Sequence, residues 1–444
     1  EMSASLVGSE MCIRDSMKRY AMDKLVYWKN KRNRKPLILK GARQVGKTWL
    51  MKEFGKKCFK NTAYINFDSD VRLRRIFEED YDIQRIIRMI NIETGERIIP
   101  EETLIIFDEV QEAPRAISSL KYFCENAPEY AVVSAGSLLG VAIHEGVSFP
   151  VGKVESLNMY PMSFREFLTA MGEEALADII EEKDYQALNT FSDKYINWLK
   201  LYYFVGGMPE AVNDYAECGD VTSVRDIQKQ ILELYENDFS KHTPNDELAR
   251  IRMVWNSIPL QLAKENKKFF FGQIRKGARA KNFELAIEWL QDCGLAGKVY
   301  RVEKPGIPLK AYTDFSAFKI YLLDVGLLGA MSDLDARSIL EKNELFTEFK
   351  GALTEQYVYQ QIISETEYTP YYFSASSHTE IDFLIQKEGQ VIPLEVKAEE
   401  NVKAKSLKAY FNKYNPPYAV RTSMMDYRKE EWMVNIPLYA ISSL

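Results

Sequence analysis

Residues 41–48 form a short loop that reads Gly41, Ala42, Arg43, Gln44, Val45, Gly46, Lys47 and Thr48. The loop matches the phosphate-binding pattern GxxxxGK[ST] at every fixed position. A buried-strand pattern, Pro36 to Lys40, precedes it, and a helical pattern, Trp49 to Phe59, follows it. The motif requires this strand–loop–helix context, and a chance match in a glycine-containing turn would not supply it. The loop therefore predicts a nucleotide site.

Each residue type in the loop has a physical role in holding a triphosphate. Glycines let backbone N–H groups close around phosphate oxygens, and the N-terminus of the next helix adds the positive end of its dipole. We expect Lys47 to place its charge on the β- and γ-phosphates and the Thr48 hydroxyl to ligate Mg²⁺. ATP is expected rather than GTP, because the chain has no NKxD motif to read guanine.

An acidic pair ends a later strand pattern. The apolar run Leu104 to Phe107 is followed at once by Asp108 and Glu109. An aspartate at this place can hold Mg²⁺ through water, and the adjacent glutamate can act as the catalytic base on the attacking water. One strand pattern, Ala63 to Asp68, separates the loop from this pair, which favours the ATPase branch that inserts an extra strand. The alternative is that Glu109 only caps the following helix.

Other candidates at this site carry weaker signals. Ser134 and Ser137 follow the next strand pattern and could contact the γ-phosphate or its water, although serine is also common in turns. A charge-neutralising cation is usual in such sites, and the candidates are Arg43, Arg115 and Lys153. Each of the three could equally be a surface charge, so the sequence does not choose among them.

Composition indicates a multidomain protein of the reducing cytoplasm. A chain of 444 residues exceeds one ordinary core, and short apolar strands between helical stretches predict a parallel sheet covered on both faces. The five cysteines are scattered, and the three histidines lack zinc spacing, so any metal chemistry is expected to use carboxylates and Mg²⁺. The formal net charge of -6 requires a local basic face for any nucleic acid. No apolar run reaches the roughly 20 residues of a membrane span.

A resemblance to a known family rests on motifs spread along nearly the whole chain from Met17. They read GARQVGKTWL, YINFDSD, LIIFDEVQEAP, SAGSLLG, YPMSFREFL, GGMPEAV, FKIYLLDVGLL and EIDFLI…VIPLEVKA. Together they resemble a prokaryotic group of predicted AAA-family ATPases whose C-terminal domain of unknown function looks like a PD-(D/E)xK nuclease fold. The group often has Gly-Arg where this chain has Gly152-Lys153, and lysine lacks the bidentate fork of an arginine finger.

Five segments are expected along the chain. Residues 1–16 resemble vector read-through, with Met17 as the start. They are followed by a P-loop ATPase core (17–160), a helical lid (161–245), a winged-helix-like domain (246–310) and a nuclease-like domain (311–444). The expected fold class is α/β: a P-loop NTPase parallel sheet with a helical lid, a winged-helix-like middle domain and a C-terminal restriction-endonuclease-like α/β domain. The middle domain is expected from a helix, Phe283 to Asp292, followed by a hairpin around Val299 to Lys310.

Carboxylates near the C-terminus suggest a second site. If Gln386 pairs with Val391 across a four-residue loop, Asp382 lies opposite Glu395 and Glu380 lies opposite Lys397. The list of expected site residues is Asp382 and Glu395 as ligands of Mg²⁺, Lys397 beside the ion, and Glu355 on the preceding helix. Opposed carboxylates repel unless a cation lies between them, and Mg²⁺ would supply it. The alternative is an ordinary amphipathic hairpin with a solvated charged face.

A basic cluster crowds the middle domain. Its cations are Lys264, Lys267, Lys268, Arg275, Lys276, Arg279 and Lys281, with the aromatic triplet Phe269, Phe270 and Phe271 among them. Such a cluster would attract a phosphate backbone, although a solvated helix face or a protein-docking surface has the same composition. The aromatic triplet is expected in the core.

Two hypotheses follow. The first is an ATPase coupled to a nucleic-acid-binding C-terminal half, with nuclease activity left open. The second is an ATP-driven switch that does not cut and binds a protein or nucleic-acid partner. Both use ATP and Mg²⁺ and neither needs a membrane. Oligomer formation is compatible with both.

Overall fold

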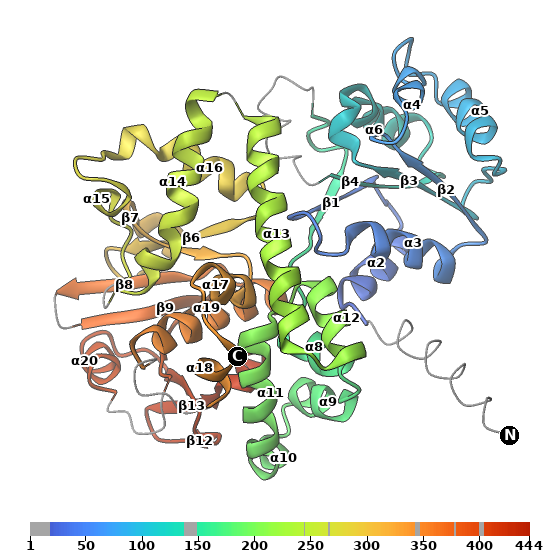
Figure 1. Ribbon diagram of the computed structural model, residues 1–444. Helices are drawn as coiled ribbons and strands as arrows, with labels where there is room; N and C mark the ends of the chain where they lie inside the picture. The colour runs from blue at the N-terminus through green and yellow to red at the C-terminus, as the bar shows by residue number, and fades with distance from the viewer. Residues whose placement is uncertain are drawn as a thin grey trace, which may run out of the picture. The chain divides into compact units, whose positions relative to one another are not determined.

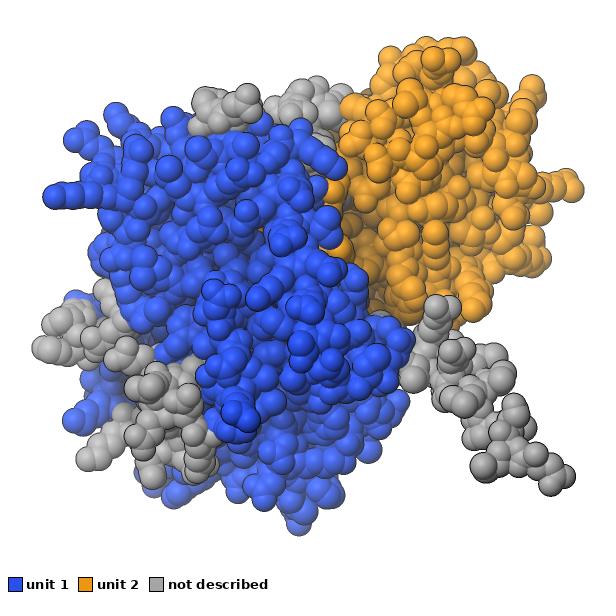
Figure 2. Space-filling model, in the orientation of Figure 1, with its two compact units in different colours: residues 1–17, 161–290, 296–444 blue, residues 18–160, 291–295 orange. Residues whose placement is uncertain are grey.

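The computed structural model describes residues 18–136, 149–243, 245–264, 267–341, 347–376, 379–398 and 404–444. Two compact units make up the chain (Figure 2). Unit 2 contains Lys18–Tyr160 and Gln291–Leu295, and unit 1 contains Pro161–Leu290 and Ala296–Leu444. The expected leader, its boundary at Met17, and Ser137 lie outside the described residues. No helix in the described ranges is long and apolar enough to cross a membrane.

Unit 2 is built on a sheet of parallel strands in the order β2-β3-β4-β1-β5. The strands are β1 (Leu37–Lys40), β2 (Asn61–Asn66), β3 (Thr103–Asp108), β4 (Ala131–Ala135) and β5 (Glu155–Asn158). Every residue of β3 is buried, as expected for a central parallel strand with both faces covered. In the sheet, the strand that lies between the loop strand β1 and the acidic strand β3 is β4. The strand that lies between the two motifs in the sequence, β2, forms the edge of the sheet.

Helices cover both faces of this sheet (Figure 1). They are α2 (Ala21–Lys29), α3 (Lys47–Cys58), α4 (Val71–Arg75), α5 (Ile83–Thr94) and α6 (Pro114–Asn126). On the side of α5 and α6, the rings of Phe67, Phe77 and Phe107 pack edge to face with centroids 5.4–5.7 Å apart. On the other side, Trp28 of α2 packs on Phe54 of α3. These cores fix the carboxyl ends of β1 and β3, where the two sequence motifs lie.

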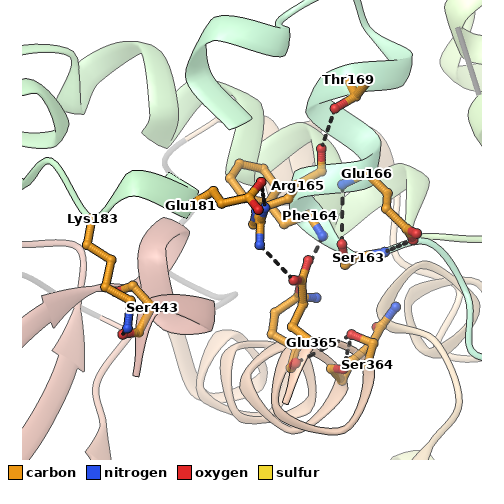
Figure 3. Close-up of polar contacts among 12 residues, drawn as sticks. Ser163, Phe164, Arg165, Glu166, Thr169, Glu181, Lys183, Ser364, Glu365 and Ser443 are labelled. Atoms are coloured by element: carbon orange, nitrogen blue, oxygen red, sulfur yellow. Dashed lines mark hydrogen bonds and ion pairs between the residues drawn. The ribbon is translucent and has the colours of Figure 1, made fainter. Parts of the chain in front are cut away.

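The helical segment after residue 160 belongs to unit 1. Its helices are α8 (Phe164–Ala170), α9 (Glu174–Glu182), α10 (Tyr185–Thr190), α11 (Ser192–Val205), α12 (Pro209–Cys218) and α13 (Val221–His242). Arg165 of α8 forms ion pairs with Glu365 of α19 (Thr347–Glu365) and with Glu181 of α9 (Figure 3). The backbone N–H of Phe164 donates to Gln361 Oε1 at 2.8 Å. The segment expected as a lid on the ATPase core is therefore attached to the C-terminal half of the chain.

Unit 1 has one mixed sheet in the order β12-β13-β11-β10-β9-β8-β6-β7. Its strands are β6 (Ala296–Val302), β7 (Thr313–Leu322), β8 (Tyr371–Ser376), β9 (Thr379–Lys387), β10 (Gln390–Val396), β11 (Ala419–Ser423), β12 (Arg428–Lys429) and β13 (Met433–Pro437). Its remaining helices are α14 (Asn245–Leu262), α15 (Phe271–Ile274), α16 (Glu284–Asp292), α17 (Val325–Met331), α18 (Ala336–Leu340) and α20 (Lys405–Tyr414). The expected domain boundary at residues 310 and 311 lies between β6 and β7, which pair with each other in this sheet.

A buried aspartate connects two of the motifs that carry the family resemblance. The carboxylate of Asp324 accepts hydrogen bonds from the N–H of Gly207 at 2.6 Å, from Gln360 Nε2 at 2.9 Å and from the N–H of Leu327 at 3.1 Å. A Cβ on Gly206 would lie 2.1 Å from this carboxylate, so glycine is required there. Burial raises the pKa of Asp324. We conclude that the GGMPEAV and LLDVGLL motifs stabilise unit 1.

Candidate functional site

The phosphate loop follows β1 and leads into α3. Gly41 has a φ of +145°, and a Cβ there would lie 2.2 Å from the carbonyl oxygen of Met159, so no other residue fits. Gly46 precedes α3 with a φ of +91°, and no side chain caps the N–H groups of the first turn. Uncapped N–H groups at a helix N-terminus, together with the helix dipole, form a site for anions. The loop thus has the form that the sequence predicts.

Lys47 lies inside this loop. Its Nζ donates to the carbonyl oxygens of Gly41 at 2.9 Å and Ala42 at 2.6 Å, and the residue is 7% exposed. Burial lowers the pKa of Lys47 to about 8, although the nearby charges of Glu109 and Asp108 oppose this shift. An ammonium held against the loop would contact the phosphates of a nucleotide that the loop surrounds.

The lowered pKa of Lys47 predicts that ATP affinity depends on pH. Bound phosphates would raise this pKa, so the free protein must take up a proton on binding ATP above pH 8. We expect the Kd for ATP to change little between pH 7 and 8, and then to rise by up to about tenfold per pH unit. Calorimetric titrations in buffers with different ionisation enthalpies would measure both effects. Lys47→Arg is the control, because a guanidinium stays charged throughout this range. An equally steep rise with arginine would exclude Lys47 as the cause.

The Mg²⁺ candidates Thr48 and Asp108 meet at the ends of α3 and β3. Thr48 Oγ1 donates to Asp108 Oδ2 at 2.7 Å, and the Tyr64 hydroxyl donates to the same oxygen at 2.9 Å. Burial, together with the hydrogen bond to Asp108, raises the pKa of Tyr64, which therefore remains a donor. A hydroxyl and a carboxylate oxygen are ligands that Mg²⁺ accepts, so these residues fit the ion. Tyr64 begins the YINFDSD stretch that carries the family resemblance, but the sequence analysis assigned it no role at the site.

Glu109 adopts an unusual backbone conformation at the end of β3. Its φ of 49° and ψ of 46° lie in the left-handed region, which is strained for a residue with a Cβ and is found preferentially at functional sites. Gln111 Nε2 donates to Glu109 Oε2 at 2.6 Å. The Glu109 side chain makes no capping hydrogen bond to the short helix Val110–Glu112 that follows it. The capping alternative is therefore not what the structure has, and Gln111 is a partner of Glu109 that sequence reasoning missed.

Three weaker candidates have other partners. Ser134 is fully buried, and its hydroxyl donates to the carbonyl oxygen of Leu37 at 3.2 Å. Arg115 Nε donates to the carbonyl oxygen of Phe77 at 2.8 Å, and Lys153 forms an ion pair with Glu125 at 2.8 Å. None of these three contacts points to a role at the phosphates, and Ser137 lies outside the described residues.

Two residues of unit 2 support the loop without belonging to its motif. The buried guanidinium of Arg19 donates to the carbonyl oxygen of Val45 at 2.8 Å and to that of Tyr160 at 2.6 Å. Gly294, with a φ of +73°, comes so close that a Cβ there would lie 3.0 Å from the nitrogen of Ala42. The sequence analysis missed both residues. For Arg19, the only signal was the basic character of the N-terminal stretch.

Arg19→Ala is expected to loosen the phosphate loop. The change removes two charged hydrogen bonds to backbone carbonyls and leaves the buried carbonyl of Val45, which belongs to the loop, without this donor. We expect a loss of about 2–4 kcal/mol in the free energy of unfolding and weaker ATP binding. Urea unfolding and ATP titration would measure the two effects. Arg72→Ala removes only an exposed ion pair to Asp70 and should leave the free energy of unfolding nearly unchanged. Equal losses in the two variants would contradict the assigned role.

The C-terminal hairpin has the expected register. Gln386 pairs with Val391, and Lys387 also pairs with Gln390, so that the turn has two residues and not four. These are Glu388 and Gly389, with φ values of 48° and 73° as in a tight hairpin turn. The extra pair changes no side chain's face, because the alternation along both strands is unaltered.

The predicted ligands of the second site lie on this hairpin. Asp382 Oδ2 accepts from the N–H of Val396 at 2.8 Å, and Glu395 Oε1 pairs with Lys397 Nζ at 3.0 Å. Burial and the charge of Glu355 raise the pKa of Asp382 to about 6, and burial raises that of Glu395. Glu395 Oε2 is buried and has no hydrogen-bond partner in the described structure. This unpartnered oxygen and Asp382 fit one divalent cation. No group of three or more metal-ligating side chains occurs among the described residues.

Glu355 differs from the expectation that it completes a metal site. Its carboxylate accepts from Lys319 Nζ at 3.0 Å, and also from Lys267 Nζ and the Tyr321 hydroxyl. Burial alone would raise the pKa of Glu355, but the charges of Lys267 and Lys319 lower it to about 2. Both oxygens thus already have cationic partners, which the sequence could not reveal because Lys319 lies in an apolar strand.

The basic cluster separates into two parts. Lys267 points to Glu355, whereas four other cations are exposed and have no ion pair among the described residues. These four, named here the basic segment, are Arg275, Lys276, Arg279 and Lys281. Phe269 is buried as expected and stacks on Phe318, but Phe270 is 43% exposed. Helix α16, which corresponds to the helix expected from Phe283 to Asp292, exposes Glu284 and Glu288, which would repel a phosphate backbone.

Comparison with known families finds a match over the region of the phosphate loop. Residues 33–168 match the family model of an AAA domain, which covers the phosphate loop and the acidic pair. Residues 196–338 and 350–441 match two models that are each described as a domain of unknown function. No curated protein matches the chain. Residues 33–168 therefore form a P-loop domain of the AAA type.

Matches among solved structures include the following three proteins. A Walker-type ATPase of Pyrococcus abyssi is 13% identical, the match covering 72% of this chain and 97% of that one, with a TM-score of 0.46. The Aeropyrum pernix ORC1 protein in complex with DNA is 13% identical over 72% and 92%, with a TM-score of 0.29. The RuvB Holliday junction branch migration motor of Thermotoga maritima is 12% identical over 66% and 90%, with a TM-score of 0.27.

Proposed function

We propose that the chain binds ATP with Mg²⁺ in unit 2 and hydrolyses it. The loop N–H groups and Lys47 would hold the phosphates, and Thr48 and Asp108 would hold the ion. Bound Mg²⁺ would neutralise charge on the phosphates. Glu109 would accept a proton from the attacking water, and Gln111 would orient the Glu109 carboxylate.

One observation carries this proposal. Thr48 Oγ1 and Asp108 Oδ2 are 2.7 Å apart, although they come from different motifs that are 60 positions apart in the sequence. In a domain of the AAA type, this contact supports a functional pairing of the loop with the acidic strand. The strained backbone of Glu109, one residue further on, supports its role as base.

We propose further that ATP hydrolysis is coupled to binding of nucleic acid by unit 1. The exposed, unpaired cations of the basic segment support this, because a polyanion would neutralise them. The exposed ring of Phe270 lies beside Lys264 and Lys268, at 4.7 Å and 6.0 Å from its centroid, which would suit a stacked base next to a phosphate. The coupling would be measured as a change in the rate of phosphate release when DNA or RNA is added.

Reversing two charges of the basic segment is expected to weaken this binding. Lys276→Glu with Arg279→Glu should lower the affinity for DNA or RNA at least tenfold and make it less salt dependent, by about 2 in the slope of log K against log salt. Fluorescence anisotropy at several salt concentrations would measure both. The control is Lys413→Glu with Lys429→Glu, which makes the same change in net charge on exposed residues elsewhere in unit 1. If both double variants bind equally, or if wild-type binding ignores salt, the surface serves a protein partner.

A second candidate activity of unit 1 is Mg²⁺-dependent cleavage of nucleic acid. It is favoured by the convergence of Asp382, Glu395 and Lys397 at one end of the β9–β10 hairpin, with a buried Glu395 oxygen that lacks a partner. A nuclease assay with Mg²⁺, with and without ATP, would test it, and Asp382→Asn should abolish cleavage. Cleavage that survives in this variant would come from a contaminant. No cleavage by the wild type would leave the ATP-driven switch that binds its partner without cutting.

A further inference from the structure

Lys319 of β7 lies inside the carboxylate group of unit 1. Its ammonium is fully buried and lies 3.0 Å from Glu355 Oε1, 2.8 Å from Glu380 Oε1 and 3.9 Å from Asp382 Oδ1. The ring of Tyr372 is 5.2 Å away. Three carboxylates, one from α19 and two from β9, surround this cation. The carboxylates alone would repel one another, so a divalent ion with oxygen ligands would otherwise be needed here.

The charges of this group nearly balance without any metal. Lys319 and Lys267 bring two positive charges, and Glu355, Glu380 and Asp382 bring three negative ones. Burial alone would lower the pKa of Lys319, but the three carboxylates raise it. Lys319 therefore stays charged. The fully enclosed Glu355 is satisfied by the two lysines and Tyr321. The remaining negative charge falls to Asp382, which is the most distant of the three from Lys319 and lies toward Glu395.

We infer that Lys319 is a built-in cation in the place of one metal ion, so that unit 1 binds one divalent cation and not two. The inference rests on the divalent site proposed above and specifies its stoichiometry. Glu355 and Glu380 would hold the lysine, while Asp382 and the unpartnered oxygen of Glu395 would hold the ion. Lys319 is then a positioning residue, which keeps the carboxylates together when no metal is bound.

Manganese binding tests this inference directly. The parent is the full chain with Lys47→Ala and Thr48→Ala, which removes metal binding at the ATP site. Electron paramagnetic resonance of free Mn²⁺ should show one bound ion per chain in the parent and none after Asp382→Asn. Adding Lys319→Met to the parent should raise the number to two. It should also lower the melting temperature in EDTA, and 1 mM Mn²⁺ should then raise that temperature by about 5 °C more than it does in the parent.

The outcomes separate this inference from the proposed function. A parent that binds no Mn²⁺ while the Lys319→Met variant binds it would overturn the divalent site and support the role of Lys319. A Lys319→Met variant that binds no additional ion, and whose melting temperature ignores Mn²⁺, would overturn the inference. If the Lys319→Met variant does not fold, Glu380→Gln in the parent tests the inference instead. Glu380 is partly exposed, and its replacement leaves Lys319 paired with Glu355. The inference predicts that the Glu380→Gln variant still binds one Mn²⁺ with about the parent's affinity. Loss of this ion would show that Glu380 is a metal ligand and would overturn the inference.

Discussion

Lys47→Ala is expected to lower ATP affinity by at least about 100-fold. The ammonium is held by two loop carbonyls and is almost completely buried, so its loss removes a positive charge from inside the phosphate loop. Loss of a charged contact in such a site costs about 2–5 kcal/mol, and 1.4 kcal/mol corresponds to a factor of ten. Equilibrium binding of a fluorescent ATP analogue would measure the change.

A matched control for Lys47→Ala is Lys52→Ala. Lys52 lies on the same helix α3, is exposed, and its ammonium lies over the ring of Tyr64 at 3.9 Å. This variant should bind ATP within about threefold of the wild type, because an exposed cation–π contact contributes only about 0.5–1 kcal/mol. Wild-type affinity in Lys47→Ala would contradict the assignment of the loop.

Glu109→Gln is expected to bind ATP normally and to hydrolyse it about 10²–10⁴ times more slowly. The amide keeps the size of the carboxylate and its contact with Gln111, but it cannot accept a proton from water. Thr48 and Asp108 are unchanged, so nucleotide and Mg²⁺ should still bind. Single-turnover phosphate release would measure the chemical step apart from product release.

Glu112→Gln is the matched control for the catalytic base. Glu112 lies three residues further on and pairs with Arg74 at 3.1 Å, away from Asp108. Its loss should leave the hydrolysis rate within about twofold of the wild type, since a partly exposed ion pair contributes little. Equal rates in Glu109→Gln and the wild type would remove Glu109 from the mechanism.

Local pattern was sufficient to predict the core of unit 2. The strand before the loop, the helix after it and the buried acidic strand all lie within two residues of their expected positions, because each has a strong periodic or apolar signal. The position of β4 between β1 and β3 was not predicted, because the order of strands in a sheet is a long-range property. The hairpin expected around Val299 to Lys310 is instead formed by β6 and β7. Residues 303–312 form the connection between these strands.

Partners distant in sequence account for what could not be predicted at the two sites. Arg19, Tyr64 and Gly294 reach the phosphate loop or Asp108 only through the fold. Lys319 lies in an apolar run, FKIYLL, where a single polar residue does not indicate any partner. Its role depends on carboxylates up to 63 positions away, and charge pairing of this kind has no local signature. The register of the β9–β10 hairpin was predictable, because the alternation of apolar and charged residues sets it.

Phosphate release from ATP by the full-length chain tests the central claim most directly. The measurement compares the wild type with Lys47→Ala and Glu109→Gln, each with Mg²⁺ and with EDTA, after ATP binding has been measured for all three. The account predicts Mg²⁺-dependent release by the wild type alone, with ATP bound by the wild type and by Glu109→Gln but not by Lys47→Ala. Release at equal rates by all three proteins, or a wild type that binds no ATP, would contradict it.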